Sequence, residues 1–215
     1  TGNAPEGFGY GAEYKTTAEI RAAKYDLTSG FHATHVSGIA SGSDKSTPYY
    51  GVAPDADLVF VSFKSTNAQI VDGIKYVFDY AKSVGKPAVV NISLGSHMGP
   101  HDGSSDTDLS FANLVGPGRI IVGAAGNEGL DKLHASKTFT ATNKQMKTMF
   151  AYGSEQANSS YKQAYVDIWA EKNSKISVKA VVVNTLNGKI IASSEVVAHD
   201  APKEVNWVAT DWSVV

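Results

Sequence analysis

Three apolar runs, separated by segments with helical periodicity, constrain the fold of this chain most strongly. The runs cover residues 58–63, 88–95 and 119–125. Near-continuous apolar runs of this length are typical of strands buried on both faces of a parallel sheet. A helix over residues 69–84 is predicted between the first two runs, with Gly85 as its stop. Strands alternating with helices predict an α/β fold, with a parallel sheet and helices on its faces.

Shorter elements are expected around this framework. Residues 17–23 form a short helix candidate, and a second helix begins at His32. A third short helix is predicted around residues 109–115, before the last apolar run. The glycine-rich and proline-rich residues 1–15, and the segments at 26–30 and 49–57, are predicted to be loops or turns.

The pattern changes after about residue 133. Residues 137–215 alternate short apolar runs with turn signals such as Asn187-Gly188 and residues 171–174. This alternation predicts an antiparallel, jelly-roll-like β-sandwich and a division of the chain into domains 1–134 and 135–215. The expected runs are 138–140, 149–152, 165–169, 176–178, 179–183, 189–193 and 205–215. Trp169, Trp207 and Trp212 are expected in the sandwich core, with a carbohydrate-binding platform as the alternative.

Composition excludes several classes of function. Charged residues make up 19% of the chain and the formal net charge is −2, so no basic field for nucleic acid is present. With no cysteine, neither a disulfide framework nor a thiolate metal site can form. No apolar run approaches the roughly 20 residues that a membrane-spanning helix needs.

The chain opens on a loop-like segment without an initiator methionine, and we expect it to be a piece of a longer protein.

Candidate functional residues follow two of the predicted strands and open one helix. Residues 91–96 (Asn-Ile-Ser-Leu-Gly-Ser) and residues 124–129 (Ala-Ala-Gly-Asn-Glu-Gly) each lie at a strand end. In parallel sheets, functional residues gather beyond the carboxyl ends of the strands. His32 and His35 stand three apart in a run of small residues, a spacing that places both on one side of a helix. An imidazole titrates near neutral pH and suits acid–base chemistry.

Together, these three segments resemble the subtilisin-like serine peptidases, the subtilases. In that family a histidine opens an H-G-T-H-V-A-G helix, a substrate-binding strand ends in S-L-G, and an asparagine lies in A-A-G-N. The resemblance covers residues 1–130. The segments at 99–103 and 116–121 resemble the branch that includes clostridial germination proteases, where a small jelly-roll is inserted before the serine motif; residues 135–215 resemble that insert.

The resemblance implies a role for each matching residue. His32 would be the general base that takes the proton from a serine hydroxyl. Asn127 would donate its side-chain amide to the oxyanion of the tetrahedral intermediate. Ser93, Leu94, Gly95 and Ser96 would bind an extended peptide or protein substrate through the backbone. No cofactor is expected, calcium binding is left open, and the expected location is outside a bacterial cell or on its surface.

Departures from the family pattern are specific. Phe31 and Ala33 stand where glycine is usual on either side of the histidine. The only aspartate before His32 is Asp26, without the preceding strand or the D-[ST]-G turn of the family, and no G-T-S nucleophile motif occurs. We expect the aspartate and the serine to lie beyond the two ends of this chain, and the chain alone to be inactive. A pseudoprotease that keeps the fold as a binding or regulatory module is the alternative.

Other histidines carry weaker expectations. His35 is predicted to be structural, packed or bonded to the backbone, since a zinc site shared with His32 has no evident third ligand. His97, His101 and Asp102 cluster after the second apolar run. A solvated loop is the favoured interpretation there, a substrate-facing loop the second and a metal site the third. The oligomeric state cannot be inferred.

Overall fold

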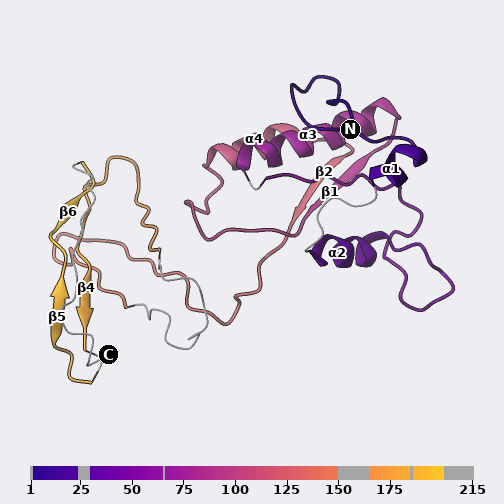
Figure 1. Cartoon of the computed structure of the whole chain (residues 1–215). Coiled ribbons are helices and arrows are strands. Elements are labelled where there is room, and N and C mark those ends of the chain that lie inside the picture. Colours follow the sequence, from indigo (N-terminus) through magenta and orange to yellow (C-terminus); the bar gives the residue numbers. More distant parts are fainter. Residues whose placement is uncertain (1, 24–29, 65, 150–164, 185, 201–215) are drawn as a thin grey trace. The chain divides into compact units, whose positions relative to one another are not determined.

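The computed structural model describes residues 2–23, 30–64, 66–149, 165–184 and 186–200 (Figure 1). The chain divides into two compact units, Thr1–Ala151 and Tyr152–Val215. The boundary expected at residues 134/135 remains a prediction. The described elements of the first unit are α1 (Thr17–Ala23), α2 (His32–Ser41), α3 (Asn67–Ser83), β1 (Ala88–Ile92), α4 (Asp106–Leu114) and β2 (Arg119–Gly123).

A parallel pair of strands forms the centre of the first unit. β1 and β2 pair in register from Ala88↔Arg119 to Ile92↔Gly123. The ladder continues one step further, because the N–H of Ala124 donates to the carbonyl of Ile92 at 3.0 Å. Helix α3 packs on β1, and α4 packs on α3 (Figure 1). The α/β class predicted from the alternating pattern is therefore confirmed.

Helix α3 is the best-formed element and supplies the core. It begins after Thr66, whose hydroxyl accepts the N–H of Gln69 at 3.3 Å as an N-cap. Its apolar stripe buries Ile74 and Phe78, which are 2% and 3% exposed. Past its C-cap lies Gly85 with a φ of +69°, the left-handed conformation that glycine adopts readily at a helix end. The helix and its stop match the sequence prediction.

The expectation of strands buried on both faces is wrong for this chain. Along β1, half-buried and exposed residues alternate. Val89, Ile120 and Val122 are 64%, 52% and 47% exposed. Because β1 rests on α3 through one face, its odd-numbered side chains, Val89 and Asn91, stay open to solvent. Apolar composition therefore predicted β1 and β2 correctly and their surroundings incorrectly.

The strand expected at residues 58–63 is not formed. This segment has no regular secondary structure, lies outside any sheet of the described residues and is largely exposed. It runs against α3, where the Cγ1 atom of Val61 lies 2.8 Å from the position that a Cβ on Gly73 would occupy. A strand needs a hydrogen-bonding neighbour as well as apolar residues, and this segment contacts a helix instead.

The strands in the described part of the second unit form two antiparallel ladders. β3 (Ser177–Val178) pairs with β6 (Val197–Ala198), and β4 (Val181–Val183) pairs with β5 (Ile190–Ser193). The turn predicted at Asn187-Gly188 joins β4 to β5: Gly188 has a φ of +70° and its N–H donates to Asn184 at 2.8 Å. β3, β4 and β5 fall within the runs predicted at 176–178, 179–183 and 189–193, whereas β6 lies in none of the predicted runs.

Other expectations for this half differ. Residues 138–140 and 165–169 form no strand, while 205–215 and all but the first residue of 149–152 lie outside the described residues. Two short ladders do not amount to a jelly-roll. Trp169 is 59% exposed, so its predicted place in a core is wrong. Trp207 and Trp212 lie outside the described residues. None of the described helices combines the length and apolarity required to cross a membrane.

Candidate active site

Helix α2 carries His32 at its first position. Phe31 precedes it as the N-cap without a side-chain cap bond and is 87% exposed. The carbonyl of Phe31 accepts the N–H of His35 at 2.9 Å and so starts the helical ladder. Both His32 and His35 are exposed. The predicted helix start is thus confirmed, while the packing expected for His35 is not observed.

The segment after β1 leaves the sheet without regular secondary structure. Asn91 donates its side-chain amide to the hydroxyl of Ser93 at 2.9 Å, and the hydroxyl of Ser96 accepts the N–H of Met98 at 3.1 Å. Ser93 is half-buried, whereas Leu94, Gly95 and Ser96 are exposed. In the described residues this segment belongs to no ladder, so its backbone is open to an extended partner.

The segment after β2 turns sharply at Gly126. This residue has a φ of +93°, in the region that glycine occupies without strain. The exposed Asn127 follows, and its N–H donates to the Glu128 carboxylate at 2.8 Å. The side-chain amide of Asn127 has no hydrogen-bond partner among the described residues and caps no turn.

The parallel register brings these two segments together. Since Ile92 and Gly123 are opposite each other, the chains that leave β1 and β2 start side by side. His97 and Glu128 join them further out, with 3.8 Å between Nε2 and Oε2. Sequence reasoning did not select Glu128, although an acidic residue directly after an asparagine at a strand end was a usable signal.

The loop after residue 97 is a series of turns. His101, Gly99 and Gly103 all have positive φ, at 54°, 106° and 81°. Asp102 accepts the N–H of Ser104 at 2.9 Å, and its hydrogen bonds from Ser104 lower the pKa of the Asp102 carboxyl. The described residues hold no group of three or more acidic or histidine side chains arranged for a metal ion. The structure favours the solvated-loop interpretation.

The structure therefore brings together two of the three segments singled out in the sequence, those that follow β1 and β2. The third segment, at the start of α2, makes no described hydrogen bond or ion pair with them. Residues 93–96 and 124–128 share one end of the sheet. No hydrogen bond or ion pair among the described residues links His32 to either segment. The individual roles of His32, Asn127 and residues 93–96 remain predictions.

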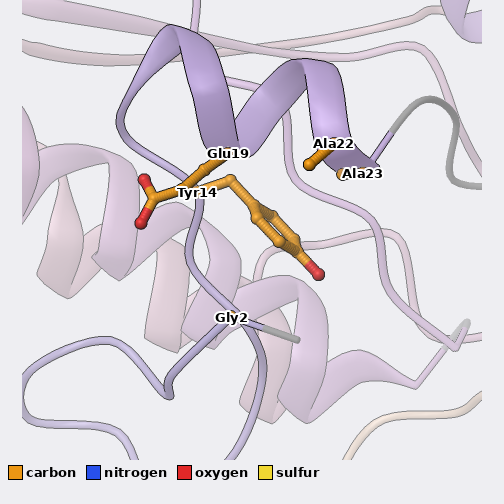
Figure 2. A pocket seen from close by; sticks show the side chains of 5 residues that line it. All are labelled: Gly2, Tyr14, Glu19, Ala22 and Ala23. Atoms are coloured by element: carbon orange, nitrogen blue, oxygen red, sulfur yellow. The ribbon is translucent and has the colours of Figure 1, made fainter.

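A pocket of about 190 Å³ lies elsewhere, beside α1 (Figure 2). Its lining includes Tyr14 and Glu19. The Glu19 carboxylate accepts the N–H of Thr16 at 2.8 Å, while the Thr16 hydroxyl accepts the N–H of Glu19 at 3.2 Å. This reciprocal pair is a capping box that starts α1. The carboxylate at this pocket thus serves the helix.

Comparison with known proteins identifies the family. Residues 11–199 match the model of the subtilase family, so the chain belongs to that family. It is 34% identical over 103 residues to the thermostable alkaline protease of Halalkalibacterium halodurans, a match that covers 46% of this chain and 26% of that protein. Against the major intracellular serine protease of Bacillus subtilis it is 34% identical over 104 residues, covering 46% and 30%.

A solved structure also matches, that of the Clostridium perfringens CspB protease. The match has a TM-score of 0.45 and 31% identity, and covers 54% of this chain and 26% of that one. The chain thus spans between a quarter and a third of the length of these relatives. Because one relative is named as intracellular, the relatives lend no support to the expected secretion.

Proposed function

We propose that this chain is part of a serine endopeptidase that cleaves peptide bonds in an extended substrate. His32 acts as the general base: it accepts the proton of a serine hydroxyl and later returns it to the leaving amine. Its position at the exposed start of α2 supports the role, because the imidazole is accessible to both the nucleophile and the leaving group.

Asn127 stabilises the oxyanion of the tetrahedral intermediate through its side-chain amide. The substrate lies along Ser93, Leu94, Gly95 and Ser96 and pairs with their backbone as an added strand. The observation that carries this proposal is the parallel register of β1 and β2, which starts the substrate-binding segment and the oxyanion loop side by side. A scissile carbonyl held by the first segment would then lie within reach of an amide on the second.

The chain alone lacks two parts of this chemistry. It holds neither the D-[ST]-G turn nor the G-T-S motif of the family. We therefore propose that activity needs an aspartate and a serine supplied by further sequence, and that the 215 residues by themselves do not hydrolyse peptides. We also propose that residues 135–215 form a β-sandwich inserted in the catalytic domain; the antiparallel β3–β6 and β4–β5 ladders support its β content.

A fluorophosphonate probe tests the proposal, because it reacts covalently with an activated serine. The longer protein that contains this chain should be labelled, and the His32→Ala variant of that protein should not. The 215-residue chain should remain unlabelled. Absence of labelling in the longer protein, with its fold verified by circular dichroism, would overturn the proposal.

A pseudoprotease is the second candidate. Phe31 and Ala33 favour it, since both add side chains beside the histidine where the family has glycine, and Phe31 is largely exposed at the start of α2. Such a protein would bind an extended peptide along residues 93–96 without cleaving it. Peptide binding by the longer protein in the absence of probe labelling would distinguish this candidate from the peptidase.

A further inference from the structure

The carboxylate of Glu128 folds back over the loop that precedes it. Its Oε2 atom accepts the N–H of Asn127 and lies 2.8 Å from the place that a Cβ on Gly126 would occupy. Glycine at 126 therefore does two things: it adopts the positive φ, and it leaves room for the carboxylate. No larger residue would allow the same contact without a shift.

The hydrogen bond to Asn127 acts on the main chain of that residue. A bond from a backbone N–H to an ionised carboxylate is stronger than one between neutral groups. It restricts rotation about the backbone of Asn127 and so restricts where its side chain can point. The Glu128 carbonyl is held as well, because it accepts the N–H of Asp131 at 2.9 Å. The main chain of Glu128, which carries the carboxylate, is thus itself held by a hydrogen bond.

The second contact of Glu128, with His97, is of a different kind. The Nε2–Oε2 distance is 3.8 Å, and the two side chains are 63% and 40% exposed. A contact of this length between two exposed side chains contributes little, typically below about 1 kcal/mol even between charged groups. The bond to Asn127 is the shorter and more directional of the two contacts, and it is the one that bears on the site.

We propose that Glu128 is a positioning residue, whose carboxylate holds the main chain of Asn127 so that the side-chain amide is aimed at the oxyanion. The proposal rests on the proposed function, since aiming matters only if Asn127 is the oxyanion donor. His97 is not required for it. The effect of Glu128 on catalysis is therefore transmitted through Asn127.

Nuclear magnetic resonance of the full 215-residue chain tests the contact without any need for activity. In Glu128→Ala the amide proton of Asn127 should move upfield and exchange faster with solvent, and Glu128→Gln should restore much of the shift, because its amide oxygen can still accept. His97→Ala is the matched control, which removes the ion-pair partner and should leave this resonance in place. An unchanged resonance in Glu128→Ala, or an equal change in His97→Ala, would overturn the proposal.

Kinetics of the longer, active protein test the consequence. Glu128→Ala should lower kcat by about 10-fold to 100-fold with little change in KM, as expected when a donor is misplaced. Asn127→Ala and the double variant Asn127→Ala/Glu128→Ala should then be equally slow. If the two losses multiply, Glu128 does not act through Asn127 and the proposal fails. If Asn127→Ala is fully active, the proposed function fails instead, while the resonance experiment still decides whether the contact exists.

Discussion

At the scale of single residues, Tyr76 joins the N-terminal segment to helix α3. Its hydroxyl donates to Glu13 at 2.7 Å, and Lys15 lies 3.0 Å from the same carboxylate. The Glu13 side chain is only 18% exposed. Phe8 packs edge-on against the Tyr76 ring, with 6.2 Å between centroids. The N-terminal segment is thereby held on the helix by a hydrogen bond and a ring contact, and the Tyr10 hydroxyl adds a second hydrogen bond, to Asp72 of α3.

Removal of the hydroxyl should weaken this attachment. We expect Tyr76→Phe to lower the free energy of unfolding of the first unit by about 1 kcal/mol, because a hydrogen bond to a mostly buried carboxylate is lost. Tyr80→Phe is the matched control, since Tyr80 stacks on Tyr76 at 6.5 Å on the same helix. Urea unfolding, followed by far-ultraviolet circular dichroism, measures the free energy of unfolding of both variants. Equal losses in the two variants would contradict the role of the Glu13 contact.

The same contact predicts a dependence of stability on pH. Burial alone would raise the pKa of Glu13, but the bonds from Tyr76 and Lys15 outweigh it, and the net pKa lies below the ordinary 4.5. The unfolded chain therefore takes up a proton at a higher pH than the folded one. The stabilisation is complete above about pH 4.5 and is lost as the pH falls through the lower folded value.

Unfolding midpoints measured at pH 7 and pH 3 test whether the stabilisation by the Glu13 contact is lost on acidification. The difference in stability between the native chain and Tyr76→Phe should shrink on acidification, because a protonated Glu13 accepts a weaker hydrogen bond. A difference that grows at low pH would show that the hydroxyl serves another partner.

At the scale of elements, Gly73 lies where residues 58–63 cross α3. Glycine in a helix interior is less favourable than alanine by about 1 kcal/mol. A Cβ at position 73, however, would meet Cγ1 of Val61 at 2.8 Å. We expect Gly73→Ala to give no gain in stability, since the overlap offsets the better helix propensity. In the background Val61→Ala, the same substitution should stabilise by about 1 kcal/mol.

Gly38 in α2 supplies the comparison for this prediction. A Cβ there would have no neighbour within 4 Å. Gly38→Ala should therefore stabilise the chain by about 1 kcal/mol on its own. Thermal unfolding of the three variants and the double variant measures these effects. A full gain from Gly73→Ala alone would mean that residues 58–63 do not lie against this helix in solution.

Residues 58–63 also show where sequence reasoning reaches its limit. Their composition matches that of β1, and both were predicted as strands, but only β1 has a pairing partner in the described residues. Helix α3 was predictable because Thr66, the stripe from Ile74 to Phe78 and Gly85 are local signals. Strand pairing depends on which distant segment is adjacent, and no local pattern carries that information.

In the candidate site, too, some features could be predicted from the sequence and others depend on contacts made only in the fold. The strand-end positions of residues 93–96 and of Asn127 were predictable, because parallel strands place their carboxyl ends at one edge. The Glu128 contact was not, since it depends on the side chain turning back over Gly126. Spacing in the sequence indicates which segments meet, whereas the orientation of one carboxylate depends on the backbone angles of the loop.

At the scale of the whole molecule, the sheet of the first unit has one covered and one open face. Ile74 and Phe78 of α3 are the buried hydrophobic residues among those described, and they belong to the helix that packs on β1. On the open face, Val89 is 64% exposed. The two faces should consequently respond very differently to substitution, although both carry apolar residues.

Phe78→Ala should lower the free energy of unfolding by about 3–5 kcal/mol, because it removes a large buried side chain and leaves a cavity. Val89→Thr should change it by less than about 0.5 kcal/mol, since threonine keeps the β-branched shape and the site is already hydrated. Chemical unfolding of both variants checks the contrast. A loss of several kcal/mol in Val89→Thr would show that this face is covered in solution, whereas a small loss in both would show that α3 does not form the core.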